Sequence, residues 1–162
     1  MTSSVQEERR YRSLFLVAED VPGLDAGESV HSAEAEPGDD AWARCHGIQS
    51  GFQVWQRVQG TDLRRLVDVR WLFPSEDDAR LYHASRMTAN AEGLRQSKGF
   101  SVPGADVAAF SGSDPFGLGS EMRICLFELG RVCAKVFLTG FDEAWGTGFV
   151  HRAAVRVEEA LR

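Results

Sequence analysis

Hydrophobic residues recur at helical spacing in three separate parts of the chain. Tyr11, Leu14 and Phe15 fall on one face of a segment that begins after Ser4, and Pro22 cannot continue a helix. Later, Ser75 and Asp142 each precede an acidic first turn, which is typical of a helix start. The pattern therefore predicts helices over residues 4–18, 75–95 and 142–161.

The segments between these helices alternate between apolar and polar residues with the period of two that favours β-strands. We expect strands over residues 28–36, 52–57, 63–73, 105–110, 121–128 and 131–139, and a loop over residues 99–104. Glycines at Gly60 and Gly130 predict two hairpins, and strands joined by short turns pair antiparallel. The expected fold is a single α+β domain over residues 1–162, with one antiparallel sheet and helices packed mainly on one face.

The composition of the chain argues against several classes of function. The chain has 18 basic and 24 acidic residues, a net charge of −6, and no lysine or arginine run, which argues against nucleic-acid binding. We find no secretory signal and no apolar window long enough to insert in a membrane. Three cysteines without CxxC spacing indicate reduced thiols, hence a bacterial cytoplasmic protein; a disulfide between Cys125 and Cys133 across a hairpin is the alternative.

Three stretches resemble known bacterial domains: residues 14–24 with their Val-Pro-Gly turn, residues 67–75 with a strand that leads into a Ser-capped helix, and residues 123–136 with a Gly-Arg-Val turn. Together they resemble the PknH-like extracellular sensor domains and LpqN-like lipoproteins of actinobacteria, which share a PsbP-like α+β fold. The resemblance implies a fold and a ligand-binding role, and it carries over no catalytic residue. The chain departs from the secreted members because it has no lipobox and no pair of disulfides.

The sequence contains no strong motif for metal binding, nucleophilic catalysis or phosphate binding. The four histidines lie on four different expected elements without HExxH spacing, so we predict no metal site and no cofactor. Cys45 and His46 are sequence neighbours, whose side chains rarely meet as nucleophile and base. The segment Gly112–Gly119 has no following Lys-Ser/Thr, so it is expected to act as a mobile loop or lid rather than a phosphate loop.

Aromatic residues give the best candidate site. Trp55 and Trp71 lie on strands expected to be neighbours, and a shared uncovered face would form an apolar groove with polar neighbours. The candidate ligand- or partner-binding residues are Trp55, Trp71, Arg70, Arg123, Phe127, Phe137 and Asp114. The alternative is that these rings fill the core or a contact between two copies of the chain.

These observations favour a non-catalytic binding module that holds a protein partner or a small apolar molecule. A small cofactor-free enzyme, such as an isomerase or cyclase, is one alternative; its pocket would lie between the sheet and Gly112–Gly119, with Asp68, Arg70 or Asp114 as polar groups. A self-associating structural subunit, for example a homodimer, is another.

Overall fold

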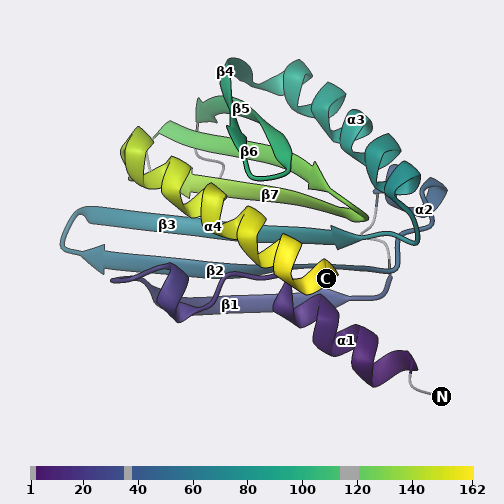
Figure 1. The fold of residues 1–162 in the computed structure, drawn as a ribbon. Coiled ribbons are helices and arrows are strands. Elements are labelled where there is room, and N and C mark those ends of the chain that lie inside the picture. The colour runs from purple at the N-terminus through teal and green to yellow at the C-terminus, as the bar shows by residue number, and fades with distance from the viewer. Residues whose placement is uncertain (1–2, 35–37, 114–120) are drawn as a thin grey trace.

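One antiparallel sheet of seven strands organises the molecule (Figure 1). The computed structural model describes residues 3–34, 38–113 and 121–162. The sheet order is β1-β2-β3-β7-β6-β5-β4. The strands are β1 (Asp25–Ser32), β2 (Gln49–Gln59), β3 (Asp62–Leu72), β4 (Arg95–Val102), β5 (Ala105–Ser113), β6 (Glu121–Leu129) and β7 (Val132–Thr139).

Three tight hairpins build most of this sheet. Two-residue turns connect β2 to β3 and β6 to β7, and Gly60 and Gly130 supply the positive φ that such turns require. The third hairpin joins β4 to β5, so the loop expected over residues 99–104 is wrong. Strand β4 is polar and mostly exposed at the sheet edge, which is why it shows no hydrophobic alternation. The α+β class and the antiparallel sheet are confirmed.

The long helices begin where their capping residues predict. Helix α3 (Glu76–Gly93) follows Ser75, whose Oγ accepts the Asp78 N–H at 3.1 Å, and α4 (Glu143–Leu161) follows Asp142, which accepts the Trp145 N–H at 2.8 Å. The shorter helical segments are α1 (Ser3–Ser13), η1 (Ala18–Asp20) and α2 (Asp40–Arg44).

Helix α1 ends at Ser13, earlier than the predicted residue 18, because side chains of β3 bind the backbone that follows. The Leu16 N–H donates to Asp68 at 2.8 Å, and the Arg70 Nε donates to the Leu14 carbonyl at 3.3 Å. These contacts replace the bonds that would continue the helix.

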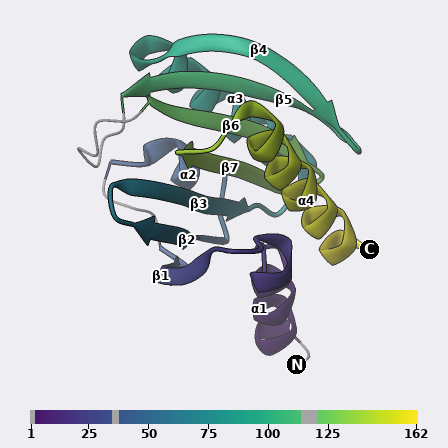
Figure 2. The same cartoon turned by 90° about the vertical axis from the view of Figure 1, so that its left-hand side faces the viewer.

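Helices cover both faces of the sheet, where the sequence predicted mainly one. Helices α1 and α4 lie together on one side (Figure 2), which we call the α1/α4 face. They enclose the main core with residues from β2 to β7, among them Trp55, Leu66, Val107, Phe127 and Val136.

Helices α2 and α3 lie on the opposite side, the α2/α3 face, and cover only part of it. Tyr82 and Ala79 of α3 pack with Trp42 of α2 against Phe73 and Cys133, and the next turns of α3 pack over β5 to β7. Neither of these two clusters contains a residue of β1 or β2. The part of the α2/α3 face formed by β1 and β2 therefore lies outside these helix-packed clusters, whereas Trp71 of β3 packs against Tyr82 of α3.

The three cysteines are free and buried. Cys125 belongs to the core of the α1/α4 face, whereas Cys133 packs on the α2/α3 face. The alternative of a disulfide between them is wrong, because their side chains lie on opposite faces of the sheet.

Candidate ligand-binding groove

A groove with a cavity volume of about 360 Å³ lies on the α2/α3 face, between α3 and the edge strand β1. Its floor is formed by β2, β3 and β7, one wall by α3, and its rim by β1 and the residue that caps α2. The lining residues are Glu28, Asp39, Ser50, Gly51, Phe52, Val54, Arg65, Val67, Val69, Trp71, Arg86, Lys135 and Phe137.

Strand register makes the floor apolar. Directly opposite residues of an antiparallel pair share a face, and Phe52 pairs with Val69 while Val54 pairs with Val67. Val67 in turn pairs with Phe137 of β7, so one row of apolar side chains runs across three strands. A floor of this composition and size is typical of a site for a small apolar molecule.

One half-buried cation, Lys135, lies within this apolar surface. Its Nζ donates to the Asn90 Oδ1 at 3.2 Å and lies 4.7 Å from the centre of the Phe137 ring. Burial, reinforced by the charge of Arg86, lowers the pKa of Lys135 to about 8. No carboxylate forms an ion pair with Lys135 among the described residues.

The two carboxylates that line the groove, Asp39 and Glu28, form no ion pair with Lys135. Asp39 caps α2 through the Trp42 N–H at 3.0 Å, and its other oxygen accepts the Tyr82 hydroxyl at 2.8 Å. Glu28 is exposed on the edge strand β1. The groove thus combines an apolar floor with a cationic wall.

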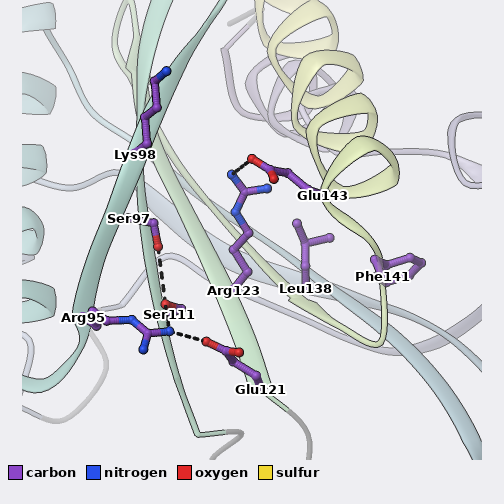
Figure 3. A pocket seen from close by; sticks show the side chains of 9 residues that line it. All are labelled: Arg95, Ser97, Lys98, Ser111, Glu121, Arg123, Leu138, Phe141 and Glu143. Atoms are coloured by element: carbon purple, nitrogen blue, oxygen red, sulfur yellow. Dashed lines mark hydrogen bonds and ion pairs between the residues drawn. The ribbon is translucent and has the colours of Figure 1, made fainter.

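A second pocket of similar volume, about 360 Å³, lies between β4, β5, β6 and the start of α4, and we call it the polar cleft (Figure 3). Arg95 forms an ion pair with Glu121 at 2.6 Å, and Arg123 faces Glu143 at 3.9 Å. Its arginines therefore already have carboxylate partners, and it offers less apolar surface than the groove.

The structure brings together only two of the residues predicted as a binding site. Trp71 and Phe137 line the groove, and Arg123 lines the polar cleft. Trp55, Phe127 and Arg70 lie on the α1/α4 face and are buried. Asp114, like most of the segment Gly112–Gly119, lies outside the described residues.

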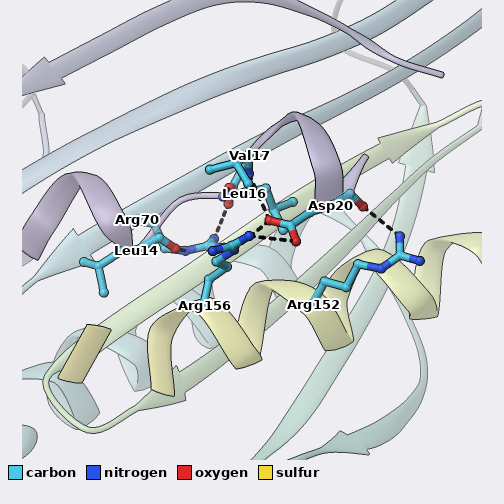
Figure 4. A network of polar contacts seen from close by, with 8 residues as sticks. Leu14, Leu16, Val17, Asp20, Arg70, Arg152 and Arg156 are labelled. Carbon is cyan, nitrogen blue, oxygen red and sulfur yellow. Dashed lines mark hydrogen bonds and ion pairs between the residues drawn. The ribbon is translucent and has the colours of Figure 1, made fainter. Parts of the chain in front are cut away.

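Asp68 and Arg70, the polar groups of the enzyme alternative, line neither of these two pockets. They form a fully buried ion pair on the α1/α4 face, where Arg70 also lies between the rings of Phe15 and Phe127. Burial raises the pKa of Asp68, and the Arg70 charge and the Leu16 N–H oppose that rise. Arg70 binds the Leu14 carbonyl (Figure 4) and Asp68 accepts the Leu16 N–H, so the pair holds the segment after α1 against the sheet, which is a structural role.

Sequence reasoning missed Lys135 and Arg86. A signal for Lys135 was present, because it lies between Cys133 and Phe137 on one face of a strand whose other residues are apolar as far as Leu138. Nothing comparable marks Arg86, whose place beside the groove depends on where α3 crosses the sheet.

The described residues contain no group of three or more histidine, cysteine, aspartate or glutamate side chains that could hold a metal ion. Within the same residues, no helix has both the length and the hydropathy of a membrane span.

Comparisons with known proteins give one informative result. No family model matches the sequence, and no curated protein matches it. The structure is similar to the crystal structure of the extracellular domain of PknH from Mycobacterium tuberculosis, with a TM-score of 0.65, 14% identity and 95% of each chain covered. The predicted localisation in the cytoplasm is wrong on this evidence, because the similar domain is extracellular. The predicted fold-level resemblance to PknH-like domains is confirmed, and at this identity the comparison shows the fold alone.

Proposed function

We propose that the chain is a non-catalytic binding domain that holds a small apolar molecule in the groove on its α2/α3 face. The observation that carries the proposal is the row of apolar side chains across β2, β3 and β7 that lines this groove. An apolar molecule bound there would transfer its own apolar surface from water to this apolar lining, and a volume of about 360 Å³ suits a small ligand.

Fluorescence titration with the neutral apolar probe N-phenyl-naphthylamine tests this proposal. We expect saturable binding, accompanied by a change in the emission of Trp71, which lines the groove. Val69→Trp would fill the floor and is expected to weaken binding at least about tenfold, a loss of about 1.4 kcal/mol.

The matched control is Val58→Trp, since Val58 is 63% exposed on the same hairpin and does not line the groove. This variant should bind the probe as the parent chain does. Equal binding by both variants would place the probe elsewhere. A dimer in light scattering that binds no probe would instead mean that a second copy covers the face, as the structural-subunit alternative requires.

A further inference from the structure

We infer that the ligand of the groove is an apolar molecule with one anionic head group, such as a carboxylate, and that Lys135 and Arg86 bind that group. This inference rests on the proposed function and adds the chemical class of the ligand. It comes from the distribution of charge and of hydrogen-bond donors around the groove.

The first step concerns Lys135. Its ammonium group lies on the floor of the groove next to Phe137, with a neutral amide, Asn90, as its hydrogen-bond acceptor. Lysine is rarely buried without a charge partner, because removal of the ion from water costs free energy. An anionic group of a ligand would supply the missing partner.

The second step concerns the wall formed by α3, which is rich in donors. Arg86 lies close enough to Lys135 to oppose its protonation, and its guanidinium lies 5.7 Å from the Tyr82 ring centre. The buried Arg86 Nε, which lines the groove, has no hydrogen-bond partner among the described residues. The same holds for the buried Nδ2 of Asn90, which contacts Lys135 but is not a lining residue. Buried donors without acceptors are unfavourable, and an anionic head group offers several acceptor lone pairs at once.

The third step is the comparison with the polar cleft. There Arg95 and Arg123 already face Glu121 and Glu143, so an incoming anion would have to compete with carboxylates of the chain itself. In the groove the other charged lining residues are Arg65, Glu28 and Asp39, and both oxygens of Asp39 accept hydrogen bonds. The lining of the groove thus has three cations, Arg65, Arg86 and Lys135, against two acids, a formal net charge of +1.

Position then sets the orientation of the ligand. Lys135 and Arg86 lie on the side of α3 and β7, whereas Phe52 and Val54 lie toward the edge of the sheet on β2. An amphipathic ligand fits with its head at Lys135 and its apolar part over β2 and β3.

Competition of the bound fluorescent probe by decanoate and decanol tests the inference, because the two molecules share an apolar chain and differ in charge. The parent chain is expected to bind decanoate about tenfold more tightly than decanol near pH 7. Lys135→Met should abolish that preference and leave decanol affinity unchanged, and Arg86→Met should reduce the preference. Lys98→Met, an exposed lysine of the polar cleft, is the matched control and should keep it.

A pH series adds a second readout. As pH rises from about 7 to about 10, Lys135 loses its proton, so decanoate affinity should fall while decanol affinity stays constant. Equal affinity of the parent chain for the two molecules would overturn the inference, as would a preference that survives in Lys135→Met. Binding of neither molecule, and of no probe, would overturn the proposed function itself.

Discussion

Arg70 and Lys135 are both withdrawn from water, Arg70 fully and Lys135 in part, but their surroundings differ. Arg70 is fully buried, but it has Asp68 as an ion partner and the Leu14 carbonyl as an acceptor. Lys135 has a neutral amide and an aromatic ring instead. The partly buried charge of Lys135 lowers the stability of the folded protein. Its position next to the groove is therefore better explained by ligand binding than by folding.

Lys135→Met should therefore stabilise the protein. Burial lowers the pKa of Lys135 from the ordinary 10.5 to about 8, so the unfolded chain binds the proton more tightly than the folded chain. The cost of the buried charge is fully present below pH 8 and disappears as pH approaches the unfolded pKa. After allowance for solvent screening, we expect a gain of about 1 kcal/mol at neutral pH, measured by urea unfolding.

The same comparison near pH 10 should show a smaller gain, and Lys98→Met should show none at either pH. A destabilised Lys135→Met at neutral pH would mean that its hydrogen bond to Asn90 outweighs the buried charge.

At the scale of elements, polar contacts tie the start of the chain to its last helix. Arg156 of α4 binds both oxygens of Asp20, at 2.8 and 3.2 Å, and Arg152 donates to the Asp20 carbonyl at 2.7 Å (Figure 4). Burial alone would raise the pKa of Asp20, but the Arg156 and Val17 hydrogen bonds and the arginine charges together lower it. The segment around η1 is thereby fixed over α4.

Asp20→Asn should loosen this connection. A carboxylate whose folded pKa is lowered adds stability above its unfolded pKa, and the stability is lost as pH falls through the folded pKa. We expect a loss of about 1–2 kcal/mol at neutral pH, and a loss that vanishes in acid below the lowered pKa. Denaturant unfolding of Asp20→Asn at neutral and acidic pH measures this loss, and the exposed Asp25→Asn is the control. A loss of stability that does not depend on pH would contradict the charge-based explanation.

Elements differ in how well their sequence predicts them. The capped helices and both glycine hairpins follow from local patterns, and the register of β2 and β3 follows too, since Gly60 and Thr61 form a two-residue turn. That register pairs Trp55 with Leu66, an odd number of residues before Trp71, so the two tryptophans must face opposite sides. Strand β4 was missed because its residues are mostly polar, whereas its partner β5 shows the alternation of apolar and polar residues.

For the whole molecule, the sheet separates the core on the α1/α4 face from the core on the α2/α3 face. Cys125 and Cys133 illustrate this, as each is fully buried in the layer on its own side. Burial raises the pKa of Cys125 to about 11, and it also raises the pKa of Cys133 and Cys45. All three thiols are therefore expected to be unreactive in the folded protein.

Titration with an aromatic disulfide reagent checks this expectation. We expect little reaction in the native state and three thiols after unfolding in urea without reductant, because all three cysteines are free. Only one thiol after unfolding would show that a disulfide had formed.

The sequence by itself determined most elements of this protein, β4 and the end of α1 excepted, because periodicity, caps and hairpin glycines act over a few residues. Two of the residues predicted from the sequence as a binding site, Trp71 and Phe137, line the groove. Only the tertiary structure decided which half of a face α3 covers, and hence that Phe52, Val69 and Lys135 line an open groove while Trp55 and Phe127 are core. The physical reason is that alternation assigns a side chain to one of two faces, whereas packing between distant segments decides what lies on that face.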